Sequence, residues 1–445
     1  MPAEDFWTPV YNAFNPWERL WGEKLDTFFV EREHSPLRKL AAQFRPGRAV
    51  QKTLLIGHRG SGKSSELLKL VSNIGDDFFT VWFDANLNLD IFSANQVELL
   101  FLLGVAVYRV AEREGLAPDR DNFDLLVDCL QTLVREHTQR IDFTLDATRL
   151  LTNVVCFGLP VIAGAVAGPA ISVGVAAMTA LARELAQDAF SLGLGRQEVA
   201  RLEVEPRTRD VARAVNLIIA DVEQKADKLV LMVVDGLDKL EPGPAHDIFI
   251  NSQVLSLPTC RVIYVTPITL YYSPDFSQTR QQFAMAPFPN VKLSHRFDPD
   301  TVYPAGLETM REVVRRRLRA LGYEPEKVIG EDALDLMARM SGGVMREMVS
   351  LMREAVVQAE ITGKTRVTEP AARAAVYELR RQYAAGLRRE HYRELEAFLE
   401  SNVPSQSETC GDLLRNLYIL SYVNDEHWYD VHPNVRPLLE GIRSG

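Results

Sequence analysis

The sequence is poor in cysteine and has no excess of positive charge. Its four cysteines are widely separated among 445 residues, which excludes a disulfide framework and a Cys-x-x-Cys metal site. Sixty Asp and Glu against fifty Lys and Arg give a net charge of −10, so no overall basic field is present to hold nucleic-acid backbones. The first residues also lack the basic and apolar stretches of a secretory signal. We therefore expect a chain that works in the reducing cytoplasm.

Apolar residues, by contrast, are abundant at 47% of the chain, which suffices for several packed cores. Continuous apolar runs at 53–56, 79–84, 229–234 and 262–265 are typical of buried parallel strands. Helical patterns alternate with these runs. This order predicts an α/β fold with a parallel sheet.

The pattern changes along the chain and predicts four parts. The N-terminal lead contains a short strand near Phe28 and a helix that starts at Ser35. In the last part, a helix with Leu413 and Leu414 precedes a predicted hairpin at 417–431, which is the order of a winged helix. The predicted parts are the lead at 1–50, the α/β sheet domain at 51–300 with a helical insertion at about 91–225, a helical lid at 301–367 and a winged-helix domain at 368–445.

A phosphate-binding motif follows the first apolar run. Gly57-His-Arg-Gly-Ser-Gly-Lys-Ser64 matches G-x-x-x-x-G-K-[ST] between a predicted strand and a predicted helix. The alternative is a chance glycine turn. In a P-loop, backbone N–H groups hold the phosphates of ATP or ADP, Lys63 neutralises them and Ser64 binds Mg²⁺. The predicted nucleotide-binding residues of this loop are Gly57, His58, Arg59, Gly60, Ser61, Gly62, Lys63, Ser64 and Ser65.

Three further residues lie at predicted strand ends. Asp235 ends the run 229–234 and should organise Mg²⁺ beside the P-loop strand; the alternative is a turn residue. Asp238 can act as the general base toward water, or belong to an ordinary surface turn. Thr266 can contact the γ-phosphate or the water, or cap the turn at Pro267.

These residues resemble the AAA+ and STAND branch of P-loop ATPases over most of the chain outside the insertion. Phe29-Val-Glu-Arg-Glu33 is similar to the "F-V-x-R-E" segment that these families place before the nucleotide domain, near the adenine. Ser341-Gly-Gly-Val-Met-Arg-Glu-Met348 is similar to the lid segment of origin-recognition-type AAA+ proteins. The resemblance implies that Arg346 touches the γ-phosphate; the alternative is a solvated arginine at a helix start.

The STAND resemblance concerns two further segments. Asp-Gly-Leu-Asp at 235–238 departs from the Asp-Glu of most AAA+ enzymes and looks like a STAND motif, which implies slow hydrolysis. Tyr429-Asp-Val-His432 resembles the winged-helix segment whose histidine holds the ADP β-phosphate in STAND switches, although His432 can equally be a packed core residue. The resemblance implies a regulatory ATPase that forms homo-oligomers in the ATP state, in defence or stress signalling, with a separate sensor or effector protein.

Residues 150–182 contain no charged side chain. The segment exceeds the roughly twenty residues that span a bilayer, and the KAP family of ATPases is similar in placing membrane segments inside a P-loop domain. Its Ala and Gly content favours instead a helical hairpin buried in protein. Membrane contact through 150–182 is thus the second hypothesis.

Two arginine series raise the question of nucleic acid. The series from Arg311 to Arg319 has few acids between its members, so it can contact DNA phosphates or reach a neighbouring subunit's ATP. The series from Arg380 to Arg393 is interleaved with Glu, which indicates pairing on a solvated face. A DNA-binding, origin-recognition-like ATPase is the third hypothesis, and the acidic hairpin disfavours it.

Overall fold

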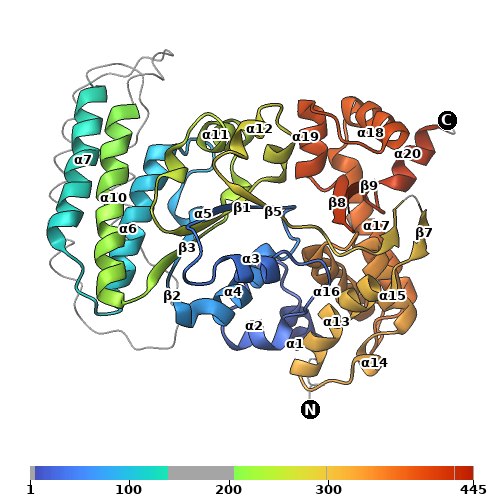
Figure 1. Cartoon of the computed structure of the whole chain (residues 1–445). Helices are drawn as coiled ribbons and strands as arrows, with labels where there is room; N and C mark the ends of the chain where they lie inside the picture. The colour runs from blue at the N-terminus through green and yellow to red at the C-terminus, as the bar shows by residue number, and fades with distance from the viewer. Residues whose placement is uncertain (1–5, 139–204, 297, 425, 444–445) are drawn as a thin grey trace.

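The computed structural model describes residues 6–138, 205–296, 298–424 and 426–443. Its centre is a five-stranded parallel sheet with the order β2-β3-β4-β1-β5 (Figure 1). The α/β fold with a parallel sheet is therefore confirmed. The strands are β1 (Lys52–Ile56), β2 (Phe78–Asp84), β3 (Leu229–Asp235), β4 (Arg261–Thr266) and β5 (Ala284–Pro287).

The sheet is buried on both faces because successive strand residues point to opposite sides. Leu55 of β1 packs into a core with the helices of the lead and with α4, while Leu54 and Ile56 pack into the core on the other face. The helices on the first face are α2 (Glu23–Phe28), α3 (Leu37–Gln43) and α4 (Lys63–Ile74).

One expectation about the lead and one about the sheet are wrong. The chain after Phe28 is extended but pairs with no described strand, and the next helix begins at Leu37, after Pro36. In the sheet, β4 lies between β1 and β3, so Asp235 is not beside the P-loop strand but one strand further. All strands run parallel, however, so their C-terminal ends still meet at one edge of the sheet.

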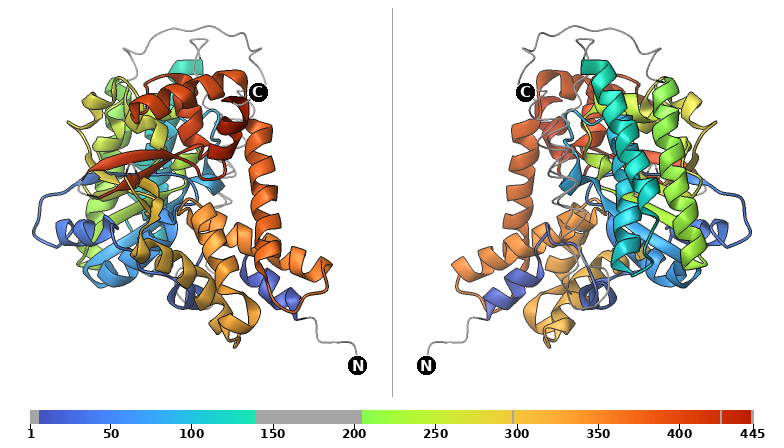
Figure 2. Two further views of the ribbon diagram at one scale, coloured as in Figure 1. Left: turned by 90° about the vertical axis from the view of Figure 1, so that its right-hand side faces the viewer. Right: turned by 90° about the vertical axis from the view of Figure 1, so that its left-hand side faces the viewer.

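Long helices stand on the other face of the sheet (Figures 1 and 2). The uncharged segment 150–182 lies outside the described residues. Within the described ranges, no helix combines the length and the apolar character that a membrane crossing needs. The described elements between β2 and β3 are α5 (Ala85–Asn88), α6 (Gln96–Arg113), α7 (Arg120–Thr138) and α10 (Glu205–Ala226).

The predicted lid region at 301–367 has a hydrophobic core that it shares with residues 7–14 and 369–386, and this set of helices is called the lid below. Trp7, Val10 and Phe14 are buried among the lid helices, and the Trp7 indole donates a hydrogen bond to the carbonyl of Lys364 at 3.2 Å. The helices of this core are α1 (Trp7–Ala13), α13 (Pro304–Ala320), α15 (Glu331–Met340), α16 (Met345–Ile361) and α17 (Glu369–Gly386), with the short α14 (Pro325–Val328) beside them.

The C-terminal part has the predicted order of helix and hairpin. Leu413 and Leu414 lie buried on the helix before an antiparallel pair of strands, and Ser421 pairs with Tyr429 across the hairpin. Figure 2 shows this part lying against both the sheet and the lid. Its elements after α17 are α18 (Arg389–Ser401), α19 (Glu408–Arg415), β8 (Ile419–Val423), β9 (His427–Val431) and α20 (Arg436–Arg443).

Candidate functional site

The glycine loop at 57–62 connects β1 to α4, as the motif predicts. Gly60 and Gly62 have φ values of 80° and 101°, a left-handed region in which residues with a Cβ are strained. Gly57 has no room for a Cβ either, because that atom would lie 2.4 Å from the carbonyl oxygen of Phe288. The loop therefore turns tightly and starts α4 at Lys63 with its free N–H groups facing the loop.

Lys63 is buried, and its ammonium group has three partners. It donates to the carbonyl oxygens of Gly57 at 2.9 Å and His58 at 2.7 Å, and it pairs with Asp238 Oδ2 at 2.8 Å. An ammonium group has three protons, so all of them are engaged. A bound phosphate must therefore replace one of these partners, and Asp238 is the one carried by a side chain.

Asp235 lies at the end of β3, 2% exposed, and its Oδ2 has no hydrogen-bond partner. Burial, and then the charge of Asp238, raises the pKa of Asp235, while Arg19 and a hydrogen bond with Ser64 act in the opposite direction. The structure thus brings together the two residues that the sequence nominates for Mg²⁺. A carboxylate oxygen without a donor beside a hydroxyl suits a hard cation.

No group of three or more His, Cys, Asp or Glu side chains forms a metal cluster in the described parts of the chain. A Mg²⁺ ion at Ser64 and Asp235 would therefore need further oxygen ligands from phosphate and water, which is how Mg²⁺ is usually held at nucleotides.

A cavity of about 540 Å³ opens over the glycine loop. Its lining includes loop residues 59–62, Asp235 and Asp238, and it also includes a set of apolar side chains. Arg317 lines the cavity near the Phe28 ring, with 5.0 Å between the guanidinium and the ring centre, and burial lowers its pKa to about 10. The apolar lining residues are Pro16, Trp17, Leu20, Phe28, Phe29, Val30, Leu68, Val313, Met345 and Val349. A nucleotide, with a charged and an aromatic end, matches this division.

The lid contributes Arg346 to the same cavity. Arg346 is in the first turn of α16, its side chain lines the cavity and its backbone N–H donates to the carbonyl oxygen of Gly60 at 3.0 Å. The lid is therefore attached directly to the phosphate loop. The position agrees with the predicted γ-phosphate contact, and the role itself stays a prediction.

The two histidines of the predicted site lie elsewhere. His58 is buried, and its Nε2 accepts a hydrogen bond from the backbone N–H of Ser421 at 3.0 Å. Burial, and then the charge of Lys63, lowers the pKa of His58 to about 3, so the ring is neutral at physiological pH. The residue links the phosphate loop to β8.

His432 is fully buried and contacts the lid. Its Nδ1 accepts from the backbone N–H of Asn434 at 3.1 Å, which puts the ring hydrogen on Nε2, and this atom donates to Glu347 Oε2 at 2.9 Å. It is not among the residues that line the cavity. In this conformation His432 therefore holds the C-terminal part against the lid.

Thr266 ends β4 and pairs in register with Ile56 at the end of β1. Its side chain is fully buried, and its hydroxyl has no hydrogen-bond partner. It does not line the cavity, although it lies between the strand that leads to the glycine loop and the strand that ends in Asp235.

Sequence reasoning missed two residues of the site, Arg19 and Asp84. Arg19 lines the cavity, makes a two-pronged ion pair with Asp84 and lies 3.8 Å from Asp235 Oδ2. Asp84 ends β2 in register with Asp235 at the end of β3. Its place at the end of an apolar run was the available signal, whereas nothing in the linear sequence marks Arg19.

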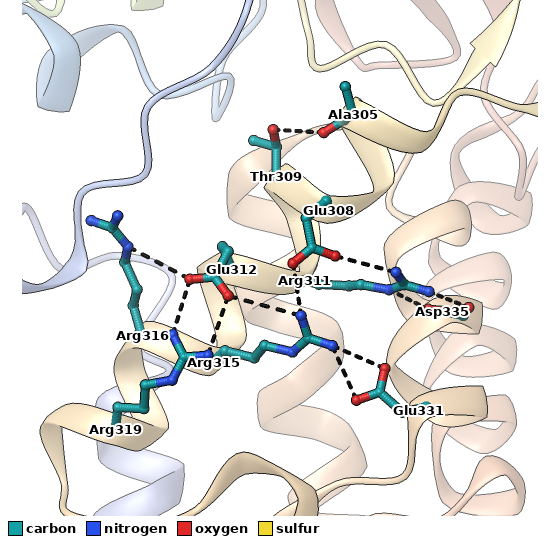
Figure 3. A network of polar contacts seen from close by, with 10 residues as sticks. All are labelled: Ala305, Glu308, Thr309, Arg311, Glu312, Arg315, Arg316, Arg319, Glu331 and Asp335. Atoms are coloured by element: carbon teal, nitrogen blue, oxygen red, sulfur yellow. Dashed lines mark hydrogen bonds and ion pairs between the residues drawn. The ribbon is translucent and has the colours of Figure 1, made fainter.

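The arginine series of α13 is not the unpaired basic patch that the sequence suggested (Figure 3). Arg311 binds Asp335 at 2.6 and 2.8 Å, and Arg315 binds Glu308 and Glu331 at 2.8 and 3.0 Å. Arg316 and Arg319 both approach Glu312, and Arg317 turns inward to the cavity. Each arginine of the series other than Arg317 thus has a carboxylate partner within the chain. This leaves fewer free charges for the predicted DNA or neighbouring-subunit contact, which stays a prediction.

The chain matches no family model and no curated protein. In fold it is similar to Cdc6p from Pyrobaculum aerophilum, with 12% identity, 97% of each chain covered and a TM-score of 0.38. It is also similar to the Aeropyrum pernix ORC2 protein in its ADP form, with 12% identity, 97% of this chain and 96% of that chain covered and a TM-score of 0.39. It is similar as well to the Thermotoga maritima RuvB Holliday junction branch migration motor, with 10% identity, 96% of this chain and 99% of that chain covered and a TM-score of 0.38. Such low identities and scores do not establish the family or the function of this chain.

Proposed function

We propose that this protein binds ATP and ADP with Mg²⁺, hydrolyses ATP slowly and changes conformation with the state of its nucleotide. One observation carries the proposal: the glycine loop, Asp235, Arg346 and the apolar lead residues all line one cavity. A nucleotide has charged phosphates and an apolar base, so a cavity with both charged and apolar lining suits it better than a small phosphate compound.

The roles follow from the placement of each group. Lys63 and the loop N–H groups would hold the phosphates, and Ser64 and Asp235 would hold Mg²⁺, which neutralises charge on the phosphate oxygens. Asp238 would orient and deprotonate the attacking water. Because Asp238 is paired with Lys63, it becomes free for this task only after the lysine turns to a phosphate. This shared partner is a physical reason for slow hydrolysis.

The contacts around the cavity support a switch more than a motor. The phosphate loop is attached to the lid through Gly60 and to β8 through His58. A further ion pair joins Arg415 of α19 to Glu241 after β3, at 2.7 Å. A change at the phosphates would thus reach both the lid and the C-terminal part. As in STAND proteins, we propose that ATP favours an open, oligomer-forming state and that a separate protein senses or transmits it.

The test is direct binding of ATP and ADP, measured by calorimetry, together with the ATPase rate. Lys63→Ala removes a charged phosphate contact, worth about 1.5–3 kcal/mol, so affinity should fall by roughly 10-fold to 150-fold. Lys69→Ala is the matched control, because Lys69 lies on the same helix, pairs with the exposed Asp26 and does not line the cavity. Equal binding by the wild type and Lys63→Ala, or none by the wild type, would refute the proposal.

A further inference from the structure

The chain between α1 and α2 crosses the cavity. Residues 15–20 line it, and they are fixed on one side by Phe14, which is fully buried in the lid core. Trp17 is 77% exposed, and the guanidinium of Arg353 lies 5.2 Å from the centre of its ring. Arg19 is the cation that this segment brings into the site.

Arg19 contacts the ends of two neighbouring strands with unequal strength. Its guanidinium binds both carboxylate oxygens of Asp84, one of them at 3.2 Å, which is a strong and directional arrangement. Its distance of 3.8 Å from Asp235 Oδ2 is too long for a hydrogen bond, so only charge attraction acts there. Asp84 thus holds the arginine in place, whereas the weaker contact of Arg19 with Asp235 can be replaced by another cation.

This contact lies where a metal ion would act. Asp235 Oδ2 accepts no hydrogen bond, and the Ser64 hydroxyl is bonded to the same carboxylate. An ion held by Ser64 and Asp235 would place two positive charges near the positive charge of Arg19, and these repel each other strongly in a buried site. Arg19 and a divalent ion are therefore poor simultaneous partners of Asp235.

We propose that Arg19 stands in for Mg²⁺ at Asp235 in the metal-free protein, and that metal–nucleotide binding displaces it and loosens residues 15–20 over the cavity. This inference rests on the proposed nucleotide site and adds its regulation. Arg19 is a positioning residue: it balances the carboxylates before the metal arrives. Metal binding is then the step that frees residues 15–20.

The experiment measures Mn²⁺ binding to the ADP-saturated protein by electron paramagnetic resonance. Arg19→Ala removes the competing charge, so Mn²⁺ affinity should rise by about tenfold or more. Arg19→Lys retains the charge and should stay near the wild type. Arg38→Ala, at an exposed pair with Glu31, is the control and should change nothing.

A second measurement follows the segment itself. Hydrogen exchange of residues 15–20 in the wild type should become faster with ADP and Mg²⁺ than with ADP and a chelator, and in Arg19→Ala it should be fast in both. Mn²⁺ affinity that is unchanged or weaker in Arg19→Ala would overturn the inference, as would metal-independent exchange. ADP binding measured in the presence of a chelator separates the two proposals. If ADP does not bind, the proposed nucleotide site is refuted; if ADP binds, a negative metal result refutes only the competition between Arg19 and the metal.

Discussion

The contact between the phosphate loop and the C-terminal hairpin can be broken at one side chain. In His58→Leu, a side chain of similar size loses the acceptor for the Ser421 N–H, which is buried and would remain unpaired. Leaving a buried donor without a partner costs about 1–3 kcal/mol. If nucleotide leaves only when the hairpin separates from the loop, the open population and the release rate rise by roughly 5-fold to 150-fold.

The assay is the release of a fluorescent ADP analogue, chased with excess ADP, alongside unfolding in urea. His58→Gln offers an amide oxygen to the same N–H and should release ADP more slowly than His58→Leu. His34→Leu, at a partly exposed position outside the cavity, is the control. A stability loss without faster release would show that the hairpin does not control the cavity. No change in either quantity would refute the hydrogen bond itself.

Two further predictions concern charge. His58 has a pKa of about 3 in the folded chain against 6.5 unfolded, so below about pH 6.5 the unfolded chain binds a proton that the folded chain does not. As the pH falls below about 6.5, the free energy of unfolding of the wild type should decrease by up to about 1.4 kcal/mol per pH unit. The difference in this free energy between the wild type and His58→Gln, measured by unfolding in urea, should therefore shrink toward pH 5. Arg311→Ala removes a partly exposed ion pair worth about 1 kcal/mol, so it should lower the melting temperature by a few degrees. The fluorescence anisotropy of a labelled DNA duplex should be the same with this variant as with the wild type. A selective loss of DNA binding would contradict the neutralised arginine series.

The glycine loop was readable from the sequence because it depends on neighbours in the chain. A strand, three glycines and Lys63 fall within a dozen residues, and their geometry follows from local backbone rules. Asp235 could be predicted for the same reason, because it is the first carboxylate after an apolar run. The position of β4 between β1 and β3 was not, because strand order is set by packing of the whole sheet.

The remaining residues depend on partners that are distant in sequence. Arg19 becomes part of the site only because the lead folds over the end of β2, where Asp84 lies 65 residues away. His432 has a lid carboxylate, Glu347, as its partner, and the histidine motif alone contains no sign of this pairing. For the α13 arginines, Glu308 and Glu312 on the same helix were visible in the sequence, whereas Asp335 on α15 was not.

The burial of α1 in the lid core has a consequence for synthesis on the ribosome. Trp7 bonds to Lys364, 357 positions later in the chain, so the first helix has no native partner until most of the protein has been made. At about 5–20 residues per second, this interval lasts roughly 20–70 s. During that time α1 waits without its native partners, whereas Arg19 can pair with Asp84 much earlier. Chaperone contact with the nascent chain should therefore concentrate at α1, and the cavity over the glycine loop, which α13 and α16 also line, should be completed late in translation.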